Sequence, residues 1–178
     1  MLRLFFALPC PTKIAAQIDA WRQDQHFAGK PVPAANLHVT LAFLGQVPES
    51  RVQLLQRVPP KLALADLAFD LNLDHLDCWP EGLLHLAPSQ PPQTLLKLAW
   101  ALQQQLKLDG FTLDSRPYRP HLTLARNSRP AETRTVPSFA WRVDQLHLYH
   151  SAGGQYLSLQ RWPVGQPQPH NRTGCFSR

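Results

Sequence analysis

Hydrophobic and polar positions change their period along the chain, and this change predicts alternating strands and helices. Residues 2–8 form a short apolar run, which is typical of a buried strand. From Thr12 onward, apolar residues recur at helical spacing. After a proline-containing break, residues 37–44 again predict a strand, which we expect to stop at Gly45. The first part of the chain therefore predicts strand, helix and strand.

The middle of the chain continues the alternation. A second helix should begin near Pro48, and the two prolines that follow Val58 should end or kink it there. Residues 69–74 then alternate between apolar and polar side chains, which predicts a half-exposed strand. A Glu-Gly turn leads into another predicted strand at 83–87. These two strands lie close enough in sequence to pair as neighbours.

The last predicted helix lies at 91–108, where two prolines precede leucines at helical spacing and Gly110 should cap the end. The remaining strands are expected at 121–125, at 139–149 and at 156–162, the last two joined by a hairpin through Gly153 and Gly154. Closely spaced strands favour antiparallel pairing over a doubly wound parallel sheet. The predicted class is therefore mixed α/β (α+β).

The length of 178 residues favours one domain. We expect this domain to span 1–163, followed by a loose tail at 164–178 that is rich in proline and polar residues. Apolar residues make up 44% of the chain and charged residues 17%, so a packed core is expected rather than disorder. The apolar run at 2–8 is too short for a membrane span.

Charge and cysteine content indicate the kind of partner and the redox compartment. The formal net charge of +6 favours an anionic partner without identifying one. The cysteines are odd in number and widely spaced, with no Cys-x-x-Cys pair, which favours a reduced, cytoplasmic protein; they are Cys10, Cys78 and Cys175. Clustered metal ligands and glycine-rich nucleotide loops are also missing from the sequence, so we expect no metal and no cofactor.

The strongest chemical signal is a repeated motif. Residues 37–42 read Leu-His-Val-Thr-Leu-Ala, and residues 120–125 read Pro-His-Leu-Thr-Leu-Ala. The strand and helix that precede each copy suggest an internal duplication. Since a strand turns alternate side chains to opposite faces, histidine and threonine share one face in each copy. We expect the apolar face of the second copy to pack under the helix at 91–108.

Two imidazoles in one cleft suit a reaction that removes one proton and delivers another, because histidine titrates near neutral pH. His38 and His121 are the candidates. The hydroxyls of Thr40 and Thr123 could bond an oxyanion, and Arg126, directly after the second motif, is the nearest candidate for a phosphate contact. Phosphodiester hydrolysis has these requirements.

These residues resemble the 2H phosphoesterases, and within them the bacterial RNA 2′,3′-cyclic phosphodiesterases, also called 2′-5′ RNA ligases. The likeness rests on the two His-x-Thr-x motifs and on the opening segment at 3–8. It implies a bilobal, pseudo-symmetric fold whose two largely antiparallel sheets line a central cleft, with helices outside. It also implies hydrolysis of 2′,3′-cyclic phosphate ends of RNA to 2′-phosphates, with 2′-5′ ligation as the reverse reaction.

The resemblance assigns roles to the motif residues. His38 would be the proton donor to the leaving 3′ oxygen, His121 the proton acceptor that activates water, and Thr40 and Thr123 the phosphate ligands. The implied partner is RNA with cyclic phosphate ends, with tRNA fragments as one source, and we expect a monomer that does not contact membranes.

Other readings remain open from the sequence. A single histidine on a half-buried strand is more often structural than catalytic, so the argument depends on the repetition. The histidines outside the motifs are interpreted as structural or solvated: His75, His85, His147 and His150. The alternative functions are a non-catalytic module that binds RNA ends and a phosphodiesterase for small cyclic nucleotides.

Overall fold

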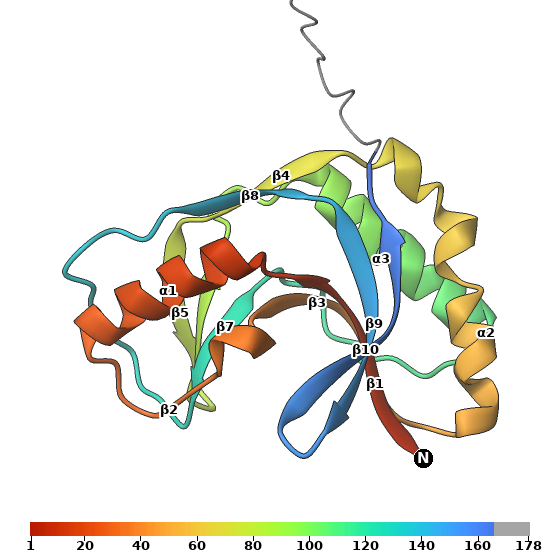
Figure 1. Cartoon of the computed structure of the whole chain (residues 1–178), viewed down its shortest axis with the longest axis horizontal. Helices are drawn as coiled ribbons and strands as arrows, with labels where there is room; N and C mark the ends of the chain where they lie inside the picture. The colour runs from red at the N-terminus through yellow and green to blue at the C-terminus, as the bar shows by residue number, and fades with distance from the viewer. Residues whose placement is uncertain (166–178) are drawn as a thin grey trace, which may run out of the picture.

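The computed structural model describes residues 1–165, which form a mixed α+β structure (Figure 1). The helices are α1 (Thr12–Gln25), α2 (Val52–Gln56) and α3 (Gln93–Leu108), with short 3-10 turns at Ala34–Asn36, Glu49–Arg51, Pro59–Leu62 and Leu64–Asp66. The strands are β1 (Leu2–Pro9), β2 (Lys30–Pro31), β3 (His38–Val47), β4 (Phe69–Leu73), β5 (His75–Trp79), β6 (Leu83–Ala87), β7 (Leu122–Arg126), β8 (Phe139–Val143), β9 (Gln145–Ala152) and β10 (Gln155–Pro163).

The strands form two sheets, and their pairs are antiparallel, as predicted. The expected pairing of 69–74 with 83–87 is wrong, because β4 pairs with β8 and β6 pairs with β5 and β7. The larger sheet has the order β10-β9-β1-β3-β7-β6-β5, with β2 beside β7, and the smaller sheet pairs β4 with β8. The larger sheet consists of two groups of strands. A single residue pair, Val39 with Leu122, joins β3 of one group to β7 of the other. The prediction of a mixed, antiparallel fold is confirmed.

Helix α3 packs against the group of strands that contains β3, and not against the group that contains β7, as we expected. The Nε2 of Gln103 on α3 donates a hydrogen bond to the carbonyl of Leu41 in β3, at 2.8 Å. Arg22 on α1 donates to the carbonyl of Leu124 in β7, at 3.1 Å. Figure 1 shows α1 on the side of β5 and β7, and α2 and α3 on the other side. The expectation that helix 91–108 covers the second motif strand is therefore wrong, because each long helix crosses to the other half.

Two predicted strand ends differ from the structure. Strand β3 continues past Gly45 to Val47, because Gly45, at φ +66°, lies at an irregularity in the pairing with β1. A glycine in this conformation accommodates a bulge without ending the strand. The predicted strand at 139–149 divides at Asp144, where the chain leaves β4 and joins β1. A change of sheet requires this break, and alternation alone does not reveal it.

Most of the predictions made from local sequence patterns are confirmed. In β4 the apolar side chains are buried and the polar ones exposed. Phe111 donates its N–H to the carbonyl of Leu106, and Gly110 has φ +78°, so the glycine caps α3 as expected. Val164 is buried, and its N–H bonds the carbonyl of Asp144. The rest of the predicted tail, from residue 166, lies outside the described residues. Within residues 1–165, no helix has both the length and the hydropathy that a membrane crossing requires.

Candidate active site

The two motif strands meet at corresponding positions. Val39 and Leu122, the residues between histidine and threonine in each motif, pair with each other and are fully buried. Antiparallel register then places His38 across from Thr123, and Thr40 across from His121. All four side chains share the face opposite Val39 and Leu122 and are half-buried. This pair therefore lies on a local pseudo-two-fold axis, and the two motifs around it share one surface.

The two imidazoles have the same anchor. Nδ1 of His38 lies 2.6 Å from the carbonyl oxygen of Asn36, and Nδ1 of His121 lies 2.8 Å from that of Arg119. Because a carbonyl oxygen only accepts hydrogen bonds, Nδ1 carries a proton in both rings. In the neutral tautomer, Nε2 is then unprotonated. Each strand thus fixes one imidazole so that its Nε2 is the nitrogen available for chemistry.

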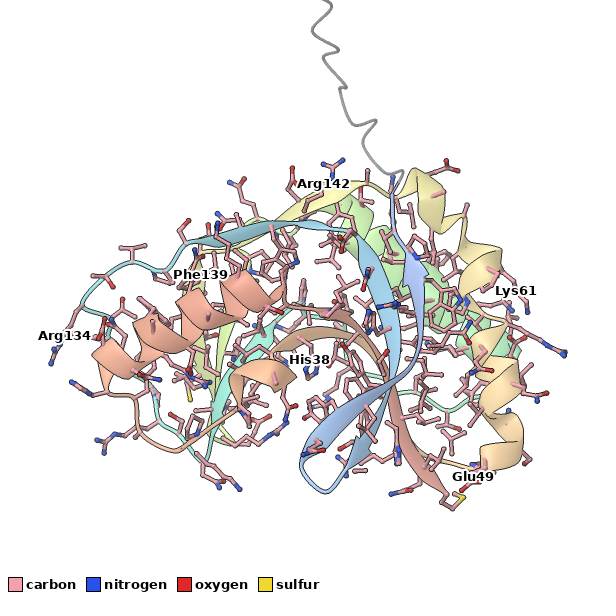
Figure 2. All side chains as sticks on the ribbon, viewed as in Figure 1. His38, Glu49, Lys61, Arg134, Phe139 and Arg142 are labelled. Carbon is pink, nitrogen blue, oxygen red and sulfur yellow. The ribbon has the colours of Figure 1, made fainter. Side chains whose placement is uncertain are left out.

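His38 lies in an aromatic enclosure. Its ring centroid is 5.0 Å from Phe5 and 5.1 Å from Tyr156, while its Nε2 lies 3.0 Å from the hydroxyl of Thr40. Figure 2 shows His38 between the α1 side and the β9–β10 side of the molecule. The pKa of His38 is lowered from 6.5 to about 4, mainly by burial, with the Asn36 carbonyl opposing the shift and the charges of His121 and Arg126 adding to it. His38 is therefore neutral in the unliganded protein at pH 7.

His121 has different neighbours. Its ring lies 4.5 Å from Trp79 and 5.5 Å from His85. Burial is the main cause that lowers its pKa, with smaller contributions from the positive charges of His85, Arg119 and Arg126, while the Arg119 carbonyl raises it. His85 is itself buried, and its Nδ1 donates to the carbonyl of Leu83. The second motif therefore has a histidine neighbour that the first motif lacks at the corresponding contact.

Two adjacent cavities open at these histidines. One, of about 310 Å³, contains His38, Thr40 and Arg126 in its lining. The other, of about 500 Å³, contains His121 and also Thr40. Arg126 is exposed, and its charge lowers the pKa of both histidines. Thr123 lies in the lining of neither cavity, so its place at the site follows only from the strand register. The structure thus gathers His38, Thr40, His121 and Arg126 around adjoining spaces.

Several residues at the site were not identified from the sequence. Arg3, Ser151 and Tyr156 line the His38 cavity, and Trp79 and His85 contact His121. Arg3 carried a usable signal, because it is a charge inside an apolar run and shares a face with Phe5. His85 carried no such signal, since only the pairing of β6 with β7 places it across from Thr123. The sequence predicted only a structural or solvated role for His85, and the structure places this buried histidine across from Thr123.

The donor set at the site consists of imidazole, hydroxyl and guanidinium groups. Within the described part of the chain, no group of three His, Cys, Asp or Glu side chains is arranged to hold a metal ion. Neutral imidazoles can accept or donate protons, and the hydroxyls and Arg126 can bond anionic oxygens. This arrangement can bind a phosphate group and move protons on either side of it.

Comparison with known proteins gives consistent results. The family model described as the 2′-5′ RNA ligase superfamily matches residues 10–155. The RNA 2′,3′-cyclic phosphodiesterase of Escherichia coli is 37% identical over 174 residues, which cover 92% of this chain and 97% of that protein. The protein of the same name from Thermus thermophilus is 31% identical, covering 92% of this chain and 90% of its own length.

Solved structures give the same result. The crystal structure of Escherichia coli LigT complexed with 3′-AMP is similar to this chain with a TM-score of 0.84 and 36% identity, covering 93% of this chain and 99% of that one. The structure titled MHV ns2 PDE domain, at 15% identity and a TM-score of 0.63, shares the fold.

Proposed function

Because this chain belongs to the 2′-5′ RNA ligase superfamily, we propose that it hydrolyses 2′,3′-cyclic phosphate ends of RNA to 2′-phosphates. One observation carries the proposal. The two His-x-Thr motifs pair through their middle residues, Val39 and Leu122, so that two imidazoles and two hydroxyls share one face. In the proposed mechanism, one imidazole is the base on one side of the phosphorus atom and the other is the acid on the opposite side. Relatives named RNA 2′,3′-cyclic phosphodiesterase support the same activity.

In the proposed mechanism, the unprotonated Nε2 of His121 takes a proton from a water molecule. The water oxygen forms a bond to phosphorus, the bond from phosphorus to the 3′ oxygen breaks, and His38 gives a proton to that oxygen. Thr40, Thr123 and Arg126 stabilise the charge on the remaining phosphate oxygens. The 2′-phosphate and a free 3′-hydroxyl result. Both rings keep their orientation because Nδ1 of each bonds a backbone carbonyl.

The donor role requires His38 to gain a proton on substrate binding. In the unliganded protein its pKa is about 4, so the ring is neutral at pH 7. A bound phosphate anion favours the imidazolium and raises this pKa. Since kcat/KM reports the free enzyme, both limbs of its pH profile should lie below 6.5, whereas kcat reports the complex and should extend to higher pH. Coincident profiles would contradict this pairing of roles.

The direct test uses an oligonucleotide that ends in a 2′,3′-cyclic phosphate. Wild type, His38→Ala and His121→Ala are assayed in EDTA, and the position of the product phosphate is identified. We expect 2′-phosphate from the wild type and a loss of about 10²–10⁴ in kcat/KM for each variant. Full activity in either variant contradicts the mechanism. Binding without turnover by the wild type would instead favour an RNA-end-binding module.

We also propose a natural substrate, a cellular location and an oligomeric state. We expect RNA ends, with tRNA fragments as one source, rather than small cyclic nucleotides. The net charge of +6 should make kcat/KM depend more steeply on salt as the oligonucleotide lengthens, because additional phosphate contacts release counterions. An equal salt slope for a mononucleotide would favour the small substrate. We also propose that the protein is a cytoplasmic monomer. Sedimentation would test its oligomeric state.

A further inference from the structure

The strand that carries the second motif contains a β-bulge just after Thr123. His85 of β6 pairs with Thr123 of β7. The preceding residue of β6, Leu84, pairs with Ala125, so Leu124 is an extra residue in β7. An extra residue shifts the alternation of side chains by one position. The residues after the bulge therefore lie on the faces opposite to those that simple alternation predicts.

The bulge explains how Arg126 reaches the active site. With strict alternation, Arg126 would point away from the face that carries His121. With the bulge, Leu124 and Ala125 both turn toward α1, where both are buried and line a separate cavity of about 230 Å³. Arg126 then lies on the same face as the motif histidines, in the lining of the smaller active-site cavity.

The register of β2 places Lys30 beside Arg126 (Figure 1). Lys30 pairs with Arg126, and Pro31 pairs with Ala125. Pro31 lines the cavity under α1 together with Ala125. Lys30, the preceding residue of the strand, therefore points to the opposite face, which it shares with Arg126. Gly29 allows this close approach, since it has φ +95° and a Cβ there would lie 2.5 Å from the carbonyl oxygen of Arg126.

The two adjacent cations have no carboxylate partner. Both side chains are exposed, and neither Lys30 nor Arg126 belongs to an ion pair among the described residues. Like charges directly across from each other destabilise a pair of strands. A bound anion removes this cost, and a phosphodiester is the anion that an RNA substrate brings to the site.

The distance of Lys30 from the centre of the site indicates which phosphate it contacts. Val39 pairs with Leu122, and Lys30 pairs with Arg126, four residues further along β7. At about 3.3 Å per residue, Lys30 lies roughly 10–13 Å along the strand from the central pair. In the proposed mechanism the reacting phosphate lies above that pair. Lys30 is therefore placed for the neighbouring phosphate of the chain rather than for the reacting one.

We propose that Lys30 binds the phosphodiester on the 5′ side of the terminal nucleotide and thereby makes the enzyme prefer RNA ends to cyclic mononucleotides. The inference rests on the proposed function, because the reacting phosphate must lie between His38 and His121. Lys30 determines specificity and does not touch the reacting atoms. Its contact is the same in the ground state and in the transition state, so it lowers KM and leaves kcat unchanged.

The test compares three substrates that differ in one phosphate. They are cytidine 2′,3′-cyclic phosphate, the dinucleotide CpC with a 2′,3′-cyclic phosphate end, and the same dinucleotide with an uncharged methylphosphonate linkage. Lys30→Gln should raise the KM for the charged dinucleotide about threefold to fivefold, and should change the other two by less than about twofold. The slope of log kcat/KM against log salt for the charged dinucleotide should fall in magnitude by about 0.7, the value for one phosphate contact.

Two further variants separate the charge of Lys30 from the structure of β2. Lys30→Arg keeps the positive charge and should retain the preference for the charged dinucleotide. Lys97→Gln is the matched control, because it removes the charge of an exposed lysine on α3, which lies on the other side of the molecule (Figure 1). It should change the KM for each of the three substrates by less than about twofold.

The outcomes distinguish this inference from the proposed function. If Lys30→Gln lowers kcat, or raises the KM for the mononucleotide and the dinucleotide equally, Lys30 supports the position of Arg126 and the inference is overturned. An unchanged KM for the charged dinucleotide, or an equal rise for the methylphosphonate, also overturns it. If the wild type hydrolyses none of the three substrates, the proposed function fails. The Kd values of the two dinucleotides for wild type and Lys30→Gln then show whether Lys30 binds the phosphodiester.

Discussion

The surroundings of His38 and His121 differ, although the same tetrapeptide pattern places both histidines. Each ring donates from Nδ1 to the carbonyl two residues earlier. His38 is enclosed by Phe5 and Tyr156 and bonds Thr40, whereas His121 contacts Trp79 and another histidine and opens on the larger cavity. The repeated motif thus accounts for the orientation of the imidazoles, and the unrepeated strands account for their differences.

In the mechanism proposed above, this difference allows one motif to serve two roles. A base must be neutral and open to the nucleophile, and His121 has both properties in a cavity of about 500 Å³. An acid must gain a proton when substrate arrives, and the enclosed His38, with a pKa of about 4, depends on the substrate anion for that proton. Four predictions test or sharpen this difference.

The largest expected effect separates acid from base by changing the leaving group. In a cyclic phosphate with sulfur at the bridging 3′ position, the departing thiolate needs no proton, since thiols ionise far more easily than ribose hydroxyls. His38→Ala should therefore recover most of the loss of about 10²–10⁴ that it shows with oxygen. His121→Ala should recover little, because water still needs a base. Rescue of His121→Ala alone would reverse the assignment.

The second prediction concerns stability at acid pH. The folded pKa of His38 is about 4 and its ordinary value 6.5, so between these pH values the unfolded chain binds more protons. The contribution of His38 to the free energy of unfolding is therefore fully present above pH 6.5. It decreases as the pH falls toward 4, by up to about 3 kcal/mol. Urea unfolding across this range should show a flatter pH dependence for His38→Phe than for wild type.

His121→Phe is the matched variant for this comparison. The pKa of His121 is also lowered by burial, so its removal should flatten the pH dependence in the same direction. The enclosed position of His38 predicts the larger change. A larger effect of His121→Phe would show that the aromatic enclosure is not what distinguishes the two rings.

The third prediction uses unpartnered polar atoms on the His121 side. Among the described residues, the buried Nε1 of Trp79 and the hydroxyl of Tyr118 have no hydrogen-bond partner, and both residues line the larger cavity. Removing an unsatisfied buried hydroxyl relieves its desolvation cost, so Tyr118→Phe should raise the free energy of unfolding by about 1 kcal/mol. Tyr156→Phe, in the His38 cavity, should leave it nearly unchanged. A loss of stability in Tyr118→Phe would show that its hydroxyl is bonded.

The local elements and the pairing of the two motif histidines on one face could be predicted because their signals are local. The alternation at 69–74 and the glycine after helix 91–108 report backbone conformation directly, and the repeated motif identified His38 and His121. The crossing of α1 and α3 to opposite halves has no local signal, since it depends on which strands pair. The division of strand 139–149 at Asp144 is hidden for the same reason.

The residues that surround the two motif histidines could not be predicted from the sequence, for the same reason. Trp79 and Tyr156 are aromatic residues on strands, and composition gives no reason to place them beside a particular histidine. Their contacts arise from pairing between β5, β6 and β7 and from the β9–β10 hairpin. The sequence therefore identified the two motif histidines, and strand pairing determined the groups that surround them.

The smallest effect is expected at His85, the histidine that the sequence did not connect with the site. Its ring lies 5.5 Å from that of His121, and its charge lowers the pKa of His121. His85→Phe keeps an aromatic ring beside Trp79 and removes the charge, so the pKa of His121 should rise. A base with a higher pKa loses its proton at higher pH, which moves the acid limb of kcat/KM upward. His75→Phe, at an exposed position, is the control, and NMR titration of His121 measures the shift directly. A fall in kcat without a change in this pKa would mean that His85 holds the ring of His121 in place rather than tuning its charge.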